Sequence, residues 1–195
     1  MRKIAFFLTA ITLASCGQSG NKTAQTDSKT TDSKTSDVKT SAAAAPADWK
    51  TYTHNTISVQ YPATWKIDGS ETRDYFTLSS PMDSSGAVAA INLTSQETNG
   101  AKIDLESSVQ QATERLKNYL TNFTLVSSKK VTDAQGDYEQ LIYTGEQSSL
   151  KLGFEQRYRI IKDKIYVLSL SCLYSSWDKS QQIGEQIMNT FTVKN

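Results

Sequence analysis

The sequence predicts an α+β domain built from an antiparallel β-sheet that is flanked by helices. Three observations support this fold class. Several stretches have strand-like composition and are joined by short connections, which favour antiparallel neighbours. Two other stretches repeat apolar residues at helical spacing. Each of these helices therefore has one apolar stripe, and the stripe must be buried on the sheet.

The predicted strands before the first helix are short and end at turn-forming residues. Pro62 stops the first of them, and the turn-forming run 81–86 separates the last two. The four segments cover residues 56–61, 65–68, 74–79 and 87–95.

The strongest helical pattern begins after Asp104, which is placed to cap the first turn. Apolar residues recur at spacings of three and four, and the opposite face is polar. This pattern predicts a surface helix with one buried stripe. The stripe consists of Leu105, Val109, Ala112, Leu116, Tyr119 and Phe123.

Four strands are predicted after this helix, over residues 125–131, 137–144, 151–161 and 164–172. In the third, Glu155, Arg157 and Arg159 alternate with mostly aromatic and apolar residues, which predicts one packed and one solvated face. The fourth is apolar on both faces and is the expected central strand. Asp163-Lys164 lies between these two strands and suggests a tight hairpin.

A second amphipathic helix is expected near the C-terminus, where Ser175 and Asp178 have a spacing like that of a capping box. Its apolar positions are Trp177, Ile183, Ile187, Met188 and Phe191.

The first residues have the pattern of a bacterial lipoprotein signal. Two basic residues precede an apolar run over 4–13, which is too short for a helix that must cross about 30 Å of hydrocarbon. The Leu-Ala-Ser-Cys motif that ends at Cys16 resembles a lipobox, which implies a cleaved signal peptide over 1–15 and lipidation of Cys16. The alternative is an ordinary signal peptide followed by a chance cysteine.

A lipidated Cys16 makes the membrane the first expected partner, because two or three acyl chains hold a protein stably to one leaflet. Gly17 stands where an aspartate often retains lipoproteins in the inner membrane. The expected location is therefore the cell membrane, through a lipid anchor, and in a Gram-negative organism the outer membrane facing the periplasm. Residues 16–47 form the lipidated cysteine and a disordered linker of Thr/Ser/Asp/Lys repeats. One domain follows over 48–195.

Composition narrows the function. The 21 basic and 20 acidic residues give a formal net charge of +1, which argues against a nucleic-acid partner. The single histidine, His54, and two distant cysteines provide no metal site and no confident catalytic set, and no cofactor is predicted. If Cys16 carries lipid, Cys172 has no intrachain partner and is expected to be a free, buried thiol.

A short motif in the predicted domain resembles a known family. Val59-x-Tyr61-Pro62-x-x-Trp65 is similar to the opening of PsbP-like domains, and the element order over 48–195 is also similar. The resemblance implies an α/β/α sandwich, shared with Mog proteins and with many bacterial lipoproteins; a cystatin-like or other α+β domain is the alternative. Photosynthetic members dock on a membrane complex and help to retain ions, but this sequence has no cluster onto which ion ligands can be carried.

The predicted function is that of a membrane-tethered cell-envelope lipoprotein, a non-enzymatic binding or assembly module for an envelope complex or ligand. A scan finds no catalytic motif and no phosphate-binding loop. The expected partner is an envelope protein. The alternative is an envelope hydrolase, or another enzyme with an unrecognised site.

For several single residues, a functional role and a purely structural role are both compatible with the sequence. His54 is a pH-sensitive contact or, as we favour, a turn residue. Trp49 and Tyr52 touch lipid headgroups or pack over the sheet edge, and packing is favoured. Residues 83–86 form a ligand loop or an ordinary turn, and the turn is favoured. A docking stripe of Glu155, Arg157 and Arg159 is less favoured than a solvated strand face with ion pairs.

Overall fold

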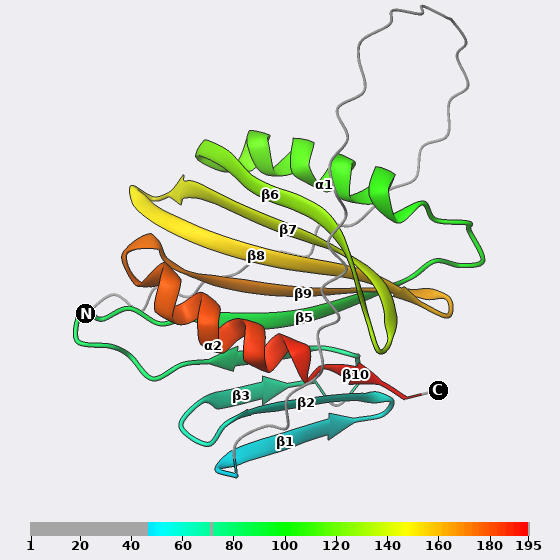
Figure 1. The fold of residues 1–195 in the computed structure, drawn as a ribbon, viewed down its shortest axis with the longest axis horizontal. Coiled ribbons are helices and arrows are strands. Elements are labelled where there is room, and N and C mark those ends of the chain that lie inside the picture. Colours follow the sequence, from blue (N-terminus) through cyan, green and yellow to red (C-terminus); the bar gives the residue numbers. More distant parts are fainter. Residues whose placement is uncertain (1–46, 71, 195) are drawn as a thin grey trace, which may run out of the picture. The chain divides into compact units, whose positions relative to one another are not determined.

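The computed structural model describes residues 47–70 and 72–194, and Figure 1 shows their arrangement. The helical elements are α1 (Leu105–Tyr119), the single-turn η1 (Tyr174–Ser176) and α2 (Trp177–Asn189). The strands are β1 (Trp49–His54), β2 (Ile57–Pro62), β3 (Lys66–Gly69), β4 (Phe76–Ser79), β5 (Ala90–Glu97), β6 (Thr121–Asp133), β7 (Gly136–Gln147), β8 (Leu150–Ile161), β9 (Lys164–Leu173) and β10 (Thr192–Val193).

Two antiparallel sheets are formed by these strands. The larger has seven strands in the order β3-β4-β5-β9-β8-β7-β6, which confirms β9 as the central strand. The predicted hairpin between β8 and β9 is confirmed, but its loop residues are Lys162 and Asp163, because Lys164 already pairs with Ile161 as the first residue of β9.

The smaller sheet, β1-β2-β10, was not predicted from the sequence. β10 has only two residues and pairs with Ile57 and Ser58 of β2, so its pattern is too short to recognise. β1 is mainly polar, and its extended conformation is stabilised by antiparallel pairing with β2.

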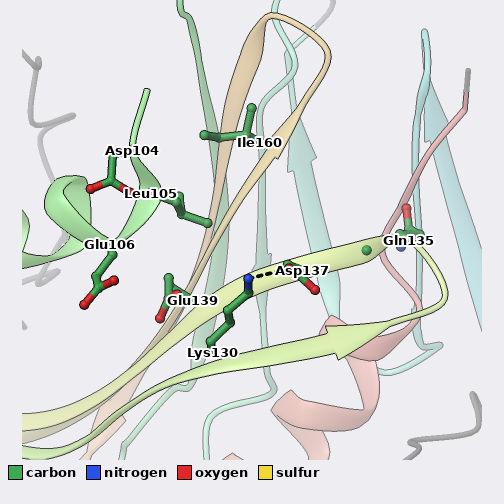
Figure 2. Close-up of a pocket in the computed structure, with 9 residues that line it drawn as sticks. Asp104, Leu105, Glu106, Lys130, Gln135, Asp137, Glu139 and Ile160 are labelled. Atoms are coloured by element: carbon green, nitrogen blue, oxygen red, sulfur yellow. Dashed lines mark ion pairs between the residues drawn. The ribbon is translucent and has the colours of Figure 1, made fainter. Parts of the chain in front are cut away.

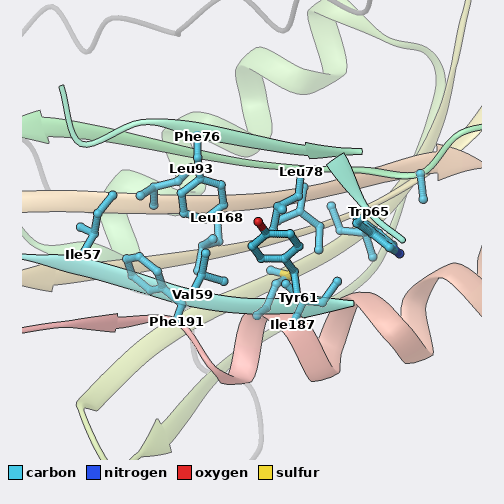
Figure 3. Close-up of a cluster of buried hydrophobic side chains, with 14 of the residues drawn as sticks. Ile57, Val59, Tyr61, Trp65, Phe76, Leu78, Leu93, Leu168, Ile187 and Phe191 are labelled. Carbon is cyan, nitrogen blue, oxygen red and sulfur yellow. The ribbon is translucent and has the colours of Figure 1, made fainter. Parts of the chain in front are cut away.

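Helix α2 and the smaller sheet cover one face of the larger sheet (Figure 3). The motif that resembles the PsbP-like opening lies in this core, where Tyr61 and Trp65 are buried and Trp65 N–H donates to the Pro62 carbonyl at 2.9 Å. Trp49 and Tyr52 pack against the same cluster, and the Tyr52 ring meets Phe76 edge-on with centroids 6.0 Å apart.

Helix α1 covers the other face and buries Val109, Ala112 and Leu116 against β7 and β8. The predicted cap is confirmed, because Asp104 Oδ2 accepts from the Ser107 backbone N–H at 3.2 Å. The larger sheet therefore lies between helical layers, which confirms the α+β class and the α/β/α arrangement.

The predicted end of this helix was wrong. Helix α1 stops at Tyr119, whose side chain is 61% exposed, and Phe123 belongs to β6. Leu120 has extended backbone angles and is buried against the α1 face of the sheet. Thr121 already pairs with Glu146 of β7, so strand pairing replaces the last predicted helical turn.

The predicted capping box of α2 was also wrong. Its N-cap residue is Ser176, which makes no side-chain cap; the Ser176 hydroxyl donates instead to the Leu173 carbonyl at 3.0 Å. The turn η1 leads directly into α2, and so places Ser175 before the cap position. Within residues 47–70 and 72–194, neither helix has the length and apolar character needed to cross a membrane.

Candidate functional site

An open groove of about 610 Å³ lies between the N-terminal end of α1 and the β6–β7 hairpin (Figure 2). Four carboxylates line it, two from the start of the helix and two from β7, together with the ammonium group of Lys130. Leu105 and Ile160 add apolar surface. The acidic lining residues are Asp104, Glu106, Asp137 and Glu139. We call this site the acidic groove.

Local rules of structure position these side chains. Asp104 and Glu106 belong to the cap and first turn of α1, where the partial positive charge of the helix end stabilises carboxylates. The β6–β7 turn closes at Gly136, whose φ of +102° suits glycine. Asp137 and Glu139 then follow at alternate positions of β7, so both side chains point to the same face of the sheet.

Hydrogen bonds keep two of the carboxylates ionised. The pKa of Asp104 is lowered mainly by the side-chain and backbone donors of Ser107. The pKa of Asp137 is lowered mainly by Lys130, whose Nζ lies 2.6 Å from Asp137 Oδ2, and then by the Thr132 hydroxyl.

Glu139 lies in the opposite environment. Burial raises its pKa, and the neighbouring charge of Glu106 raises it further. A positive charge entering the acidic groove therefore relieves repulsion at Glu139 as well as pairing with the other carboxylates.

Partly buried hydrogen bonds from β8 and from the C-terminal segment hold the β6–β7 turn in place. Arg159 Nη2 donates to Asp133 Oδ2 at 2.5 Å, and Gln135 Nε2 donates to the Phe191 carbonyl at 2.5 Å. Gln135 Oε1 accepts from the Val193 backbone N–H at 3.0 Å. The C-terminal segment and β8 thus fix one wall of the acidic groove.

The solvated face predicted for β8 was wrong. Glu155 is fully buried, and Arg157 and Arg159 are nearly so, because α2 and the segment after it cover this face. Their charges are paired internally: Glu155 Oε1 accepts from Arg157 Nε at 2.8 Å and from Gln140 Nε2 at 2.7 Å. These residues are not an exposed docking stripe.

His54, Cys172 and Asp83 do not line the acidic groove. Cys16 falls outside the described residues. His54 is partly exposed beside the β1–β2 turn, where its Nε2 is 2.8 Å from Asn55 Nδ2. Cys172 is a buried free thiol, and burial raises its pKa. Asp83 Oδ1 accepts from the backbone N–H groups of Ser85 and Ala87, so this loop is held by turn chemistry.

The sequence predicts Asp104 as a helix cap, but it does not predict the acidic groove. Acidic pairs at alternate positions, 104 with 106 and 137 with 139, were the available signal. Nothing in the sequence showed that the start of α1 faces the β6–β7 hairpin. Within residues 47–70 and 72–194, no group of three or more His, Cys, Asp or Glu residues is placed to hold a metal ion.

The α/β/α arrangement and the order of the strands in the larger sheet are those of a PsbP-type domain. The family described as PsbP-like protein matches residues 4–193, and the chain belongs to this family. Among curated proteins, no significant sequence relative was found.

Solved structures share the fold at low sequence identity. Cyanobacterial PsbP (CyanoP) from Synechocystis sp. PCC 6803 has a TM-score of 0.59 and 10% identity, over 80% of this chain and 98% of that chain. PA94 from Pseudomonas aeruginosa, a protein of unknown function, has a TM-score of 0.57 and 14% identity, over 76% and 99%. LpqN, involved in cell envelope biogenesis of Mycobacterium tuberculosis, has a TM-score of 0.51 and 18% identity, over 71% and 83%.

Proposed function

We propose that this protein is a membrane-tethered cell-envelope lipoprotein that acts as a non-enzymatic binding module. Its partner is an envelope protein, and the acidic groove receives a positively charged segment of that partner. The lipid on Cys16 holds the domain at the membrane, in an outer membrane facing the periplasm where the organism has one.

The observation that carries the proposal is the charge and shape of the acidic groove. Four carboxylates and one ammonium group line an open depression, together with the apolar residues Leu105 and Ile160. An open groove suits an extended chain, since enclosed cavities are typical of small-molecule sites. The ionised carboxylates of Asp104 and Asp137 attract a basic segment from a distance.

Two further observations support the envelope setting. The chain belongs to the PsbP-like family, and LpqN, which has a similar fold, is described as involved in cell envelope biogenesis. The lipobox-like motif that ends at Cys16 supplies the membrane attachment that such a role needs.

A hydrolase is the second candidate, because Glu139 has a raised pKa while Asp137, two residues away on the same face, has a lowered one. Separated pKa values of two carboxylates are the arrangement of an acid and a base in catalysis. We favour the binding module because the groove is open to water, which weakens such chemistry.

The proposal can be tested with a fluorescent (Lys-Ala)₄ peptide as the probe and the full-length chain in detergent. Fluorescence anisotropy is expected to show binding that weakens several-fold between about 50 and 300 mM salt, because screening reduces exposed charge pairing. The triple variant Glu106→Gln, Asp137→Asn, Glu139→Gln is expected to lose at least tenfold in affinity.

A matched triple variant controls for net charge. Asp68→Asn, Glu114→Gln and Asp163→Asn remove three exposed carboxylates that do not line the acidic groove. Equal loss of affinity in both triple variants would show that binding of the probe depends only on the net charge of the protein, and would contradict the proposal. Crosslinking in intact membranes then tests whether the groove variant alone loses its envelope partner.

A further inference from the structure

We propose that the free edge of β6 is a second docking site, which takes an extended acidic segment of a partner protein as an added strand of the sheet. This goes beyond the proposed function, because the site is a strand edge and its ligand has the opposite charge to that of the acidic groove.

β6 is a long edge strand of the seven-stranded sheet (Figure 1). It has 13 residues, and none of them is buried. β7 pairs with one side of it, so along the other side the outward backbone N–H and C=O groups have no strand partner among the described residues. The opposite edge strand, β3, has only four residues.

The regular part of this edge is shorter than the strand. The register with β7 shifts between Thr121 and Thr124 and again between Leu125 and Ser127, and is continuous from Ser127 to Asp133. We call residues 127–132 the β6 edge. The second shift leaves Val126 unpaired and 62% exposed beside Leu125, which is 44% exposed. A strand on the β6 edge thus meets an apolar contact at one end.

Charge identifies the occupant. Lys130 is already paired with Asp137 in the acidic groove, but Lys129 forms no ion pair within residues 47–70 and 72–194. Pairing of an added strand with the β6 edge is most stable when an acidic residue lies opposite Lys129, since opposite charges that face each other across strands are stabilising. The occupant is therefore an extended segment with an acidic residue at this position and apolar residues that reach Val126.

A second copy of this chain fits less well. Residues 121–132 contain no acidic side chain, so the β6 edge of another copy cannot place a carboxylate opposite Lys129. Exposed lysines on an edge strand also oppose pairing between identical edges. Lys129 thus selects against self-association and in favour of an acidic strand.

The test uses two peptides that differ only in charge. The acidic probe is acetyl-Thr-Thr-Glu-Glu-Thr-Thr-Val-Val-amide, which in antiparallel pairing places one glutamate opposite Lys129 and the valines beside Leu125 and Val126. The basic probe replaces both glutamates with lysine. Binding to the full-length chain is followed by ¹⁵N NMR shifts and by hydrogen exchange of the backbone amides of 127–132.

We expect the acidic probe to shift and protect the β6 edge. Titrated by the shifts of residues 127–132, its binding at this edge should be at least fivefold tighter than that of the basic probe, which is expected to bind the acidic groove instead. Lys129→Glu should reverse this preference, while Lys50→Glu, at an exposed position of β1, should leave it unchanged. Because Lys129 is exposed, the variant is expected to fold, and its unperturbed spectrum checks this.

Three results would overturn the inference: equal binding of both probes at the β6 edge, shifts confined to residues away from β6, or a dimer of the free chain in sedimentation that is lost in Val126→Asp. The groove variant Glu106→Gln, Asp137→Asn, Glu139→Gln should still prefer the acidic probe. Failure at the β6 edge is therefore distinguishable from failure of the acidic groove, which is measured with the (Lys-Ala)₄ peptide.

Discussion

Arg159 of β8 donates through Nη2 to Asp133 Oδ2 at 2.5 Å, and so ties the end of β6 to the buried face of the sheet. The guanidinium of Arg159 also lies 5.1 Å from the centre of the Tyr138 ring, within reach of a cation–π interaction. One charged side chain, predicted from the sequence to be solvated, thus holds the turn that forms a wall of the acidic groove.

Replacement of Arg159 by Met should lower the free energy of unfolding by about 1–3 kcal/mol, because it leaves a partly buried carboxylate without its charged donor. Urea denaturation measures this change. The control is Lys117→Met, which breaks the exposed pair with Glu114 and should cost less than about 1 kcal/mol. Equal losses in the two variants would contradict the role assigned to the buried pair.

The second prediction concerns the apolar stripe on one face of α1. Leu116 is buried against the sheet, whereas Tyr119, which has the same helical periodicity, is 61% exposed. Leu116→Ala should therefore cost about 2–5 kcal/mol of unfolding free energy. Tyr119→Ala should cost less than about 1 kcal/mol, because the residue is at the surface. Similar midpoints for both variants would show that the stripe is not the buried face of α1.

Periodicity predicted most of the fold because alternation and helical spacing are local properties of the chain. β9 was identified as central because both of its faces are apolar, and the structure buries both. The same reasoning failed for Arg157 and Arg159. Alternation of charged with aromatic residues usually indicates a solvated face, but here α2 and the residues after it cover the charges and pair them.

The acidic groove could not be predicted for a different reason. Its carboxylates come from two segments separated by about thirty positions, and their meeting depends on how α1 lies on β7. Asp104 was recognised because a cap bonds to its own helix, a local contact. The residues next to Glu139 in the sequence do not indicate its role, because its raised pKa arises from burial and from Glu106 across the groove.

Glu139 should destabilise the folded domain at neutral pH. Its pKa is raised in the folded state, so the folded chain keeps this proton more tightly than the unfolded chain does. Stability is therefore lost as pH rises from the ordinary value of 4.5 through the raised pKa. Glu139→Gln should raise the free energy of unfolding at pH 7 by less than about 1 kcal/mol, and this gain should vanish at pH 3.

Asp137 should behave in the opposite way, since the Lys130 ammonium lowers its pKa. Its contribution is present above the ordinary value of 3.8 and is lost as pH falls through the lowered pKa. Asp137→Asn should therefore lower stability at pH 7, and this effect should shrink as pH falls below 3.8. Thermal unfolding of both variants across pH 2–7 measures the two profiles, and effects of the same sign would contradict the electrostatics assigned to the acidic groove.

The proposed lipid anchor leads to a prediction that does not depend on the domain. Two or three acyl chains on Cys16 would be enough to hold the protein to a membrane. A protein without lipid on Cys16 would lack this anchor. In detergent phase separation, wild-type protein should enter the detergent phase and Cys16→Ser should remain in the aqueous phase. Cys172→Ser is the matched control and should partition as wild type does. A Cys16→Ser protein that still enters the detergent phase would contradict lipidation.

Cys172 should react only when the domain opens. Its thiol is buried, and burial raises its pKa, so both access and the thiolate fraction are reduced at neutral pH. In a Cys16→Ser background, a thiol reagent should modify Cys172 more than about 100-fold more slowly than the thiol of Tyr174→Cys, because a protected group reacts through rare opening. Tyr174 is a suitable reference, since it lies two residues away and is exposed. Urea should abolish the difference. Rapid modification of Cys172 in the folded protein would place the thiol at the surface and contradict the packing of β9 beneath α2.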